Sequence, residues 1–365
     1  MVKGYYTIRT LSNEIVLSGV SESGKLGAIF STLNQMKKEN NVSNQPQTPR
    51  DYIRLFFSGL AMGSSDIVPG VSGGTMAFIL DIYEDLLNAI KSFNLDVIRH
   101  LLQFKFREAI NMTHWRFLLP LGAGIGTAIL ALSGILSWLL DNEPVYLFSF
   151  FLGLVVASIV AVGARIENWS LPVIGSLVGG TVLAYWIVGL VPANVSHSPL
   201  NLFLSGVVAI MAMILPGISG SFILLILGQY EYVLESVKEL RIFDLAAVAA
   251  GCAVGIAFFS RILSYLLERY RAVMIAALVG FMIGSLRKIW PWKEAAEKTI
   301  ESHGESFGKI NVLPDFTSSE FLFALALFVI GFVLVSFLEH QRTHNNPFIR
   351  LFTRSSKPDV QSEAI

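Results

Sequence analysis

Long runs of uncharged, apolar residues limit what most of this chain can fold into. A helix that crosses the hydrocarbon layer of a membrane needs roughly 20 such residues. Three stretches reach this length without a formal charge: Phe117–Leu140, Val145–Ala164 and Leu171–Val191. Further apolar runs are Asn201–Gln229, Phe243–Leu267 with Asp244 and Arg261 inside it, Phe321–Leu338 and the shorter Ala272–Ile289, which holds Arg287 and Lys288 near its end. Only 15% of the residues are charged, against about a quarter in soluble proteins. The sequence therefore predicts an all-α, polytopic membrane protein.

The membrane part is an internal duplication. Sliding the sequence by 147 residues lays Leu55–Leu87 over Leu202–Leu234 without a gap, and 14 of the 33 positions are identical. The identities include a Pro-Gly-x-Ser-Gly motif at Pro69 and again at Pro216, each followed at the same distance by Tyr-Glu. Shared hydrophobicity does not produce such a match, so we expect two copies of one helical unit.

Each Pro-Gly-x-Ser-Gly motif breaks an apolar segment. Proline removes a backbone donor and clashes with the preceding turn, and glycine permits backbone angles that helices do not use. Roughly 12 to 16 mostly apolar residues lie on either side of each proline, enough to reach the middle of a bilayer but not to cross it. We therefore predict two re-entrant hairpins, with Pro69, Gly70, Pro216 and Gly217 as structural hinges.

Basic residues predict how the chain crosses the membrane. Lys and Arg stand on both flanks of the first broken segment, which favours the cytoplasm for both. A hairpin followed by three crossings then inverts the second repeat relative to the first and leaves both termini cytoplasmic. The region Arg287–Glu320 fits poorly, because it falls outside although it carries five basic residues. The predicted divisions are a disordered cytoplasmic tail (1–50), membrane repeats at 51–197 and 198–340, and a cytoplasmic tail (341–365).

Composition narrows the partners. The formal net charge is zero, which gives no support for a nucleic-acid partner. The single cysteine, Cys252, forms neither an intramolecular disulfide nor a metal cluster, and the sequence predicts no metal and no cofactor. The sequence leaves open whether the protein forms a homo-oligomer.

The polar start of the chain lacks a signal-peptide pattern, and Met36, followed by two lysines, is an alternative translation start.

The breaks are the predicted binding site. Half-helices that begin at Ser72-Gly73-Gly74-Thr75 and at Ser219-Gly220-Ser221 would present unpaired N–H groups, hydroxyls and the positive end of a helix dipole. This combination suits an anion, above all a phosphate. The alternative is that the glycines only permit close helix packing. No Gly-Lys-Ser/Thr follows, so nucleotide hydrolysis has no support.

Ionisable residues inside membrane segments are costly and are therefore functional candidates. Asp66 precedes Pro69 by three residues, and its repeat partner is Met213, so the acid is a candidate for proton coupling or for a salt bridge. Arg261 is the candidate that neutralises an anionic headgroup; the alternative is an arginine that reaches back to the membrane interface. The hairpin ends carry equivalent pairs that would cap or lock them: Tyr83, Glu84, Tyr230 and Glu231.

Pairs of glycines four residues apart predict close contacts between helices. They are Gly122/Gly126, Gly175/Gly179, Gly251/Gly255 and Gly280/Gly284.

Four segments together resemble the PopT family of bacterial membrane proteins. They are the stretch from Gly63 to Thr75, Ile82-Tyr83-Glu84, the stretch from Leu215 to Ser221, and Gly284-Ser-Leu-Arg-Lys-Ile-Trp-Pro-Trp292. The resemblance spans about residues 52 to 340. It implies a transporter that returns undecaprenyl phosphate across the bacterial cytoplasmic membrane, for reuse in peptidoglycan and other envelope polymers. The lipid phosphate would bind at the breaks, with membrane lipid around it.

Two other functions stay open on the sequence alone. One is a channel or transporter for small anions, which an enclosed aqueous pore would favour. The other is a membrane enzyme that acts on a lipid phosphate, although no nucleophile–base motif is visible.

Overall fold

The computed structural model describes residues 6–10, 13–17, 46–68, 71–93, 95–190, 195–302 and 305–343. The chain divides into two compact units, Met1–Gln47 and Thr48–Ile365. In the first unit, strands β1 (Tyr6–Thr10) and β2 (Asn13–Leu17) form an antiparallel pair with Tyr6 opposite Leu17. The predicted disorder of residues 1–50 and the predicted boundaries of the tails and repeats stay predictions.

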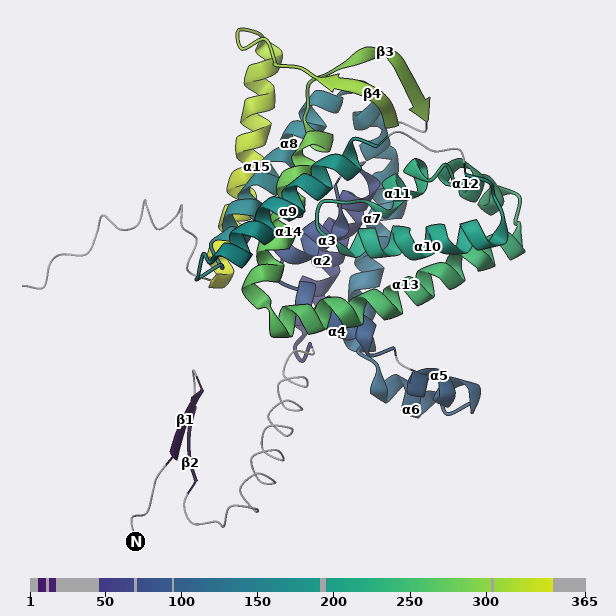
Figure 1. The fold of residues 1–365 in the computed structure, drawn as a ribbon, viewed down its shortest axis with the longest axis vertical. Coiled ribbons are helices and arrows are strands. Elements are labelled where there is room, and N and C mark those ends of the chain that lie inside the picture. The colour runs from purple at the N-terminus through teal and green to yellow at the C-terminus, as the bar shows by residue number, and fades with distance from the viewer. Residues whose placement is uncertain are drawn as a thin grey trace, which may run out of the picture. The chain divides into compact units, whose positions relative to one another are not determined.

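The second unit is built mainly of helices, and its order of elements repeats (Figure 1). The first series is α2 (Pro49–Ile67), α3 (Gly73–Ile79), α4 (Tyr83–Lys91), α7 (Trp115–Asn142), α8 (Pro144–Gly163) and α9 (Leu171–Val188). The second series is α10 (Pro199–Ile214), α11 (Gly220–Ile226), α12 (Tyr230–Lys238), α13 (Ile242–Arg269), α14 (Arg271–Ile289) and α15 (Ser319–Thr343). Helices α5 (Leu95–Leu102) and α6 (Phe106–Met112) stand between α4 and α7.

In the described part of the chain, six helices are long and apolar enough to cross a membrane. They are α7, α8, α9, α13, α14 and α15, three from each series, as the sequence predicts. The ambiguous run Ala272–Ile289 is thus a full-length helix. The protein is a multi-pass, all-α membrane protein; the inversion of its repeats stays a prediction.

Local sequence explains where the broken segments begin and end. Thr48 and Asp51 form a reciprocal capping box at the start of α2, and Pro49 occupies its first turn. The helix ends at Ile67, two residues before Pro69. Helices α2 and α3 then pack on each other, as do α10 and α11, so each broken segment folds back as a hairpin.

The returning arms are shorter than predicted. Each is a seven-residue helix, about 10 Å long at 1.5 Å per residue. A second turn interrupts the chain after it, at Asp81 with φ 56° in the first repeat and at Gly228 with φ 65° in the second. Both residues adopt the left-handed conformation, which glycine adopts without strain and aspartate more readily than most residues. The sequence carries only this weak signal for the turns.

Helix pairing is partly exchanged between the repeats. Helix α2 packs along α7, and α10 packs along α13, each within its own repeat (Figure 1). By contrast, α9 packs along α14 and α15 packs along α8. The last helix of each repeat therefore finds its main partner in the other repeat.

The region Arg287–Glu320, whose basic residues fit the predicted topology poorly, contains an antiparallel hairpin of β3 (Lys293–Ser302) and β4 (Glu305–Asn311). Two hydrogen bonds hold the strand ends to the end of α14: the indole N–H of Trp290 donates to the carbonyl of Val312 at 2.9 Å, and the amide Nδ2 of Asn311 donates to the carbonyl of Arg287 at 3.0 Å.

Candidate functional site

The first break lies between the end of α2 and the start of α3; its hinge residues Pro69 and Gly70 fall outside the described residues. The hydroxyl of Ser72 caps α3 by accepting from the amide of Gly74 at 3.1 Å. The carboxylate Oδ1 of Asp66 accepts from the amide of Gly73 at 2.7 Å. A Cβ atom on Gly73 would come within 2.5 Å of Asp66 Oδ2, so a side chain there would displace the carboxylate. At this break the amides of Gly73 and Gly74 are bonded, contrary to the expectation of unpaired N–H groups.

The second break has a different cap. Pro216 and Gly217 turn the chain, and Gly217 adopts φ 91°. Ser219 occupies the N-cap position of α11, but its side chain makes no capping hydrogen bond to a backbone amide of the helix. Its hydroxyl lies 2.7 Å from that of Ser221 instead. The start of α11 thus carries two hydroxyl groups, and neither caps a backbone amide of the helix. Such hydroxyls are suited to donate hydrogen bonds to an incoming acceptor.

The two breaks are in direct contact, although more than 130 residues separate them. The hydroxyl of Ser72 donates to the carbonyl of Met213 at 3.3 Å. The amide of Gly217 donates to the hydroxyl of Thr75 at 2.9 Å. All three bonds of this set join a side chain of the first repeat to the backbone of the second; the third runs from the hydroxyl of Tyr83 to the carbonyl of Ile214 at 3.0 Å.

Small residues allow this approach. A Cβ atom on Gly74 would come within 2.9 Å of the Ile214 carbonyl oxygen. Within the second repeat, Gly220 lets α11 lie close to α10, because a Cβ atom on Gly220 would come within 2.9 Å of the Ala209 carbonyl oxygen. Ser72 and Thr75 are fully buried, at 0% and 1% exposure. The structure thus brings the residues of the first break and the hinge of the second into one buried cluster.

Helix α14 lines the second break with residues that the sequence analysis did not nominate. A Cβ atom on Gly217 would come within 2.7 Å of the Ser285 hydroxyl and 3.0 Å of the Phe281 carbonyl. The ammonium of Lys288 lies 4.3 Å from the centre of the Phe222 ring, on α11. Lys288 is half-buried. The available signal was the segment Gly284–Trp292, which was already part of the family resemblance.

Arg261 lies elsewhere. It is exposed on α13, and its guanidinium donates to the carbonyl of Ala257, one turn earlier in the same helix. Exposed aromatic side chains, Phe258 and Tyr265, lie one turn before it and one turn after it. Among the bonds found in the described residues, none joins Arg261 to a break.

The ends of the two hairpins differ. In the first, Tyr83 is buried, and the Glu84 carboxylate pairs with Arg271 at 2.8 Å. The preceding turn is also held: Arg165 contacts Asp81 at 2.6 Å and the buried Glu339 of α15 at 3.8 Å. These pairs tie the first hairpin to α14, to α15 and to the turn that follows α8. The locking role of Glu84 stays a prediction.

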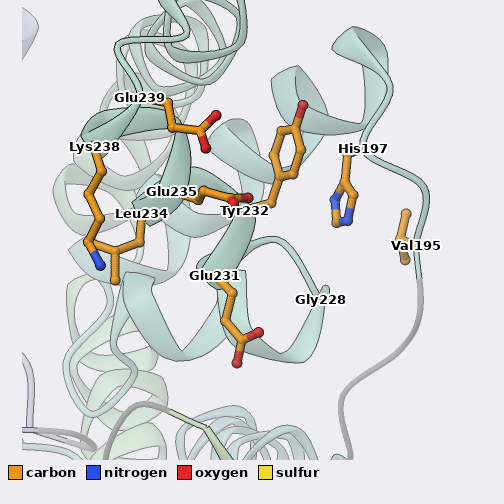
Figure 2. A pocket seen from close by; sticks show the side chains of 9 residues that line it. All are labelled: Val195, His197, Gly228, Glu231, Tyr232, Leu234, Glu235, Lys238 and Glu239. Atoms are coloured by element: carbon orange, nitrogen blue, oxygen red, sulfur yellow. The ribbon is translucent and has the colours of Figure 1, made fainter.

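In the second hairpin, Tyr230 is half-buried and Glu231 lines a pocket of about 680 Å³ (Figure 2). Figure 2 shows the His197 ring beside that of Tyr232; the two stack at 4.2 Å. Three carboxylates line this pocket, those of Glu231, Glu235 and Glu239. Their negative charge disfavours a phosphate, so the pocket is a poor candidate for an anion site.

Comparison with known proteins assigns the family. The family described as undecaprenyl phosphate translocase-like matches residues 62–307. The chain belongs to this family. A polyprenyl-phosphate transporter of Vibrio cholerae is 41% identical over 297 residues, which are 79% of this chain and 96% of that relative. A polyprenyl-phosphate transporter of Staphylococcus aureus is 31% identical over 252 residues, 64% of this chain and 84% of the relative. No solved structure matches the chain.

Family membership confirms the resemblance predicted from the sequence motifs. The residues that the family matches contain both breaks, the whole of α14 and Arg261. The residues that form the contact between the two breaks therefore lie within the part of the chain that the family model matches.

Proposed function

We propose that this protein transports polyprenyl phosphate: as a flippase, it returns undecaprenyl phosphate across the bacterial cytoplasmic membrane for reuse in the synthesis of envelope polymers. The observation that carries the proposal is the buried contact between the two broken segments, with hydroxyls and a lysine at the second break. The names of the relatives supply the lipid. Broken helices that meet inside a membrane bundle are where secondary transporters bind their substrates.

The two breaks take different roles in this proposal. The Asp66 carboxylate already accepts the Gly73 amide at the first break, and a second anion beside it would be repelled. We therefore place the phosphate at the second break, on Ser219, Gly220 and Ser221, with Lys288 supplying the positive charge. Ser72, Gly73, Gly74 and Thr75 support that site across the repeat boundary, and Asp66 is the candidate for proton coupling. Arg261, exposed on α13, would meet the headgroup on its way in from the lipid.

Transport follows from a change in how the breaks contact each other. If the repeats are inverted, an alternate state related by the repeat symmetry exchanges the roles of the two hairpins. The bond from Tyr83 to the carbonyl of Ile214 would be replaced by one from Tyr230 to the carbonyl of Ile67, its counterpart 147 residues earlier. The site would then open to the other side of the membrane, with both chain termini in the cytoplasm throughout.

The decisive experiment measures the accessibility of the undecaprenyl phosphate headgroup in the two leaflets of proteoliposomes. Wild-type protein is expected to move the headgroup, and Lys288→Met is expected to slow the movement at least tenfold, since a hydrogen bond or contact to a charged group is worth about 1.5–3 kcal/mol. The matched control is Arg287→Met, on the adjacent residue, whose guanidinium stacks on Tyr185 at 4.5 Å rather than on α11.

Four outcomes would contradict the proposal. Folded wild-type protein that moves no headgroup refutes transport of this lipid. Equal rates in Lys288→Met and wild type, with a loss only in Arg261→Ala, move the site from the second break to α13. Release of a dephosphorylated lipid from labelled substrate indicates an enzyme, and uptake of inorganic phosphate without lipid movement indicates a small-anion transporter.

A further inference from the structure

Helices α5 and α6 are an insertion that the repeat does not need. In the second repeat, α12 ends at Lys238 and α13 begins at Ile242, so three residues join them. In the first repeat, the equivalent helices end at Lys91 and begin at Trp115, and the chain between them holds two extra helices. The insertion is closed at its base, because the amide of His114 donates to the Ser92 hydroxyl at 3.3 Å. Its presence in one repeat alone indicates a task separate from the duplicated core.

The insertion presents aromatic side chains outward. Phe104 is 80% exposed and Phe106 is 54% exposed, and their rings meet edge to face at 6.0 Å. Ile110, one turn after Phe106, is 48% exposed. Meanwhile Val97 of α5 and Ala109 of α6 are each 2% exposed, so the pair has an interior of its own. Among the side chains that the structure describes in α5, α6 and their turn, those of Phe104, Phe106 and Ile110 lie outside it.

The turn between α5 and α6 holds one of these rings. It places Phe104 in the left-handed conformation, with φ 58°. Leu240, in the turn between α12 and α13, has the same conformation, with φ 54°, and is 74% exposed. The exposed aromatic pair, and not the backbone of the turn, therefore distinguishes the insertion.

Charge identifies the partner. From Lys91 to Arg116 the chain carries five basic residues and two acidic ones. Lys105 and Arg107 alternate with the two exposed phenylalanines. The corresponding stretch of the second repeat, Lys238–Phe243, has only six residues, of which two are basic and one is acidic. Basic residues beside exposed aromatics are typical of segments that lie in the headgroup region of an anionic bilayer.

The position of the insertion fits this partner. Helix α6 ends at Met112, three residues before α7, one of the helices long enough to cross the membrane. Three residues span at most about 11 Å, so the insertion stays close to the plane where α7 enters the bilayer. Arg116 lies over the Trp115 ring at 5.6 Å at that point, the residue types that mark a membrane interface.

We propose that α5 and α6 form a membrane-surface element that inserts Phe104, Phe106 and Ile110 into the interface of an anionic leaflet, while Lys105 and Arg107 contact its headgroups. The element binds lipid independently of substrate transport, so the proposal stands whether or not the transported molecule is undecaprenyl phosphate.

The test uses the full chain in nanodiscs that each hold one copy. In a Cys252→Ser background, an environment-sensitive fluorophore is attached at Ile110→Cys or, as the matched control, at Glu108→Cys. Glu108 is exposed on the same helix and pairs with Lys105 at 4.0 Å; two residues of helix place it about 200° around the axis from Ile110. In discs that contain phosphatidylglycerol, brominated acyl chains are expected to quench the label at 110, and aqueous iodide the label at 108.

Two variants separate the causes. Lys105→Glu with Arg107→Glu is expected to return the label at 110 to water in phosphatidylglycerol discs, since each basic residue near an anionic surface changes the bound-to-free ratio about fivefold. Phe104→Ser with Phe106→Ser is expected to do so in any lipid while headgroup transport continues. Equal iodide access at 108 and 110 in single-copy anionic discs would overturn the proposal. Shielding at 110 that arises only when several copies share a vesicle would assign the surface to a second copy instead.

Discussion

Gly59 and Gly124 face each other where α2 crosses α7, and neither position can hold a side chain without a shift. A Cβ atom on Gly59 would come within 2.0 Å of the Leu121 carbonyl oxygen, and one on Gly124 within 2.0 Å of the Phe56 carbonyl oxygen. Gly206 and Gly251 repeat the arrangement between α10 and α13, at 2.4 and 2.0 Å from backbone oxygens. Close backbone approach at glycines is how helices pack in membranes without a hydrophobic driving force.

The glycine pairs predicted from spacing are correct in the second repeat only. Gly251, Gly255, Gly280 and Gly284 all contact a neighbouring helix, but nothing lies within 4 Å of a Cβ atom on Gly122, Gly126, Gly175 or Gly179. In those two helices Gly124 and Gly180 make the contacts instead. Spacing alone does not reveal which face of a uniformly apolar helix meets a partner.

This difference supplies a prediction with its control in the same helix. Gly124→Val is expected to lower the stability of the protein by about 1–3 kcal/mol, because the side chain must displace backbone atoms of α2. Gly122→Val, two residues away, is expected to leave stability within about 0.5 kcal/mol, since surface changes of this kind are usually small. Thermal unfolding in detergent measures both. Equal losses in the two variants would mean that helix propensity, and not packing, sets the cost.

A second prediction concerns the hydroxyl that joins the breaks. Thr75→Val removes the acceptor for the buried amide of Gly217 and is expected to cost about 1–3 kcal/mol, the penalty for an unsatisfied buried donor. Thr127→Val is the matched change, because that hydroxyl is exposed on α7 and donates only within its own helix, to the Ala123 carbonyl at 2.8 Å. Thr75→Ser should restore most of the stability. A Thr75→Val protein as stable as Thr127→Val would show that the cross-repeat bond contributes nothing.

At the scale of elements, the two broken hairpins share a design but not a state. The first is capped by Ser72, holds the Asp66 carboxylate and shares three hydrogen bonds with the second, two of them donated by the first and one by the second. The second leaves its N-cap hydroxyl bonded to Ser221. Residues identical in the two repeats thus occupy different environments, as an alternating mechanism requires of equivalent elements.

The proposed exchange predicts mutational effects of opposite sign. Tyr83→Phe removes a bond of the described state and should favour the alternate one, whereas Tyr230→Phe should disfavour the alternate state. Each hydrogen bond is worth about 1 kcal/mol, which shifts a two-state ratio about fivefold. A cysteine at Ser221 in a Cys252→Ser background reports the ratio through its rate of labelling from each side of oriented vesicles. Shifts in the same direction for both tyrosines would contradict the exchange.

At the scale of the whole molecule, the exchanged pairs α9–α14 and α8–α15 make each repeat depend on the other. A half alone would expose the face on which the last helix of its partner packs, together with glycine surfaces such as Gly153 and Gly331, whose Cβ atoms would come within 2.0 and 2.3 Å of backbone oxygens on the facing helix. The cross-repeat bonds at the breaks would also be lost.

This dependence predicts the behaviour of a divided protein. When the chain is split between residues 197 and 198, each half expressed alone is expected to be degraded, because its interface faces lipid without a packed partner. Co-expressed halves should accumulate and co-purify, and they should transport if the proposed function is correct. Recovery of either half as a stable, folded monomer would show that the repeats are independent domains.

The amino-acid sequence alone is enough to predict a multi-pass membrane protein, its internal duplication, the positions of the two breaks and the family. Each of these depends on composition or on residue order along the chain, and a run of 20 apolar residues has one stable solution in a bilayer. Helix lengths and turns depend on local backbone angles and are harder to predict from the sequence. The sequence carries only weak signals for the turns at Asp81 and Gly228 and for the β3–β4 hairpin.

The contacts between residues far apart in the chain depend on how the helices pack. The contact between the breaks, the exchange of α9 and α15 and the approach of Lys288 to α11 join segments far apart in the chain, and no periodicity encodes them. The same holds for Arg261, whose place on an exposed helix face could not be read from its depth in an apolar run. In a membrane helix both the packed and the lipid-facing sides are apolar, so the sequence marks the helix but not its partner, and packing makes that choice.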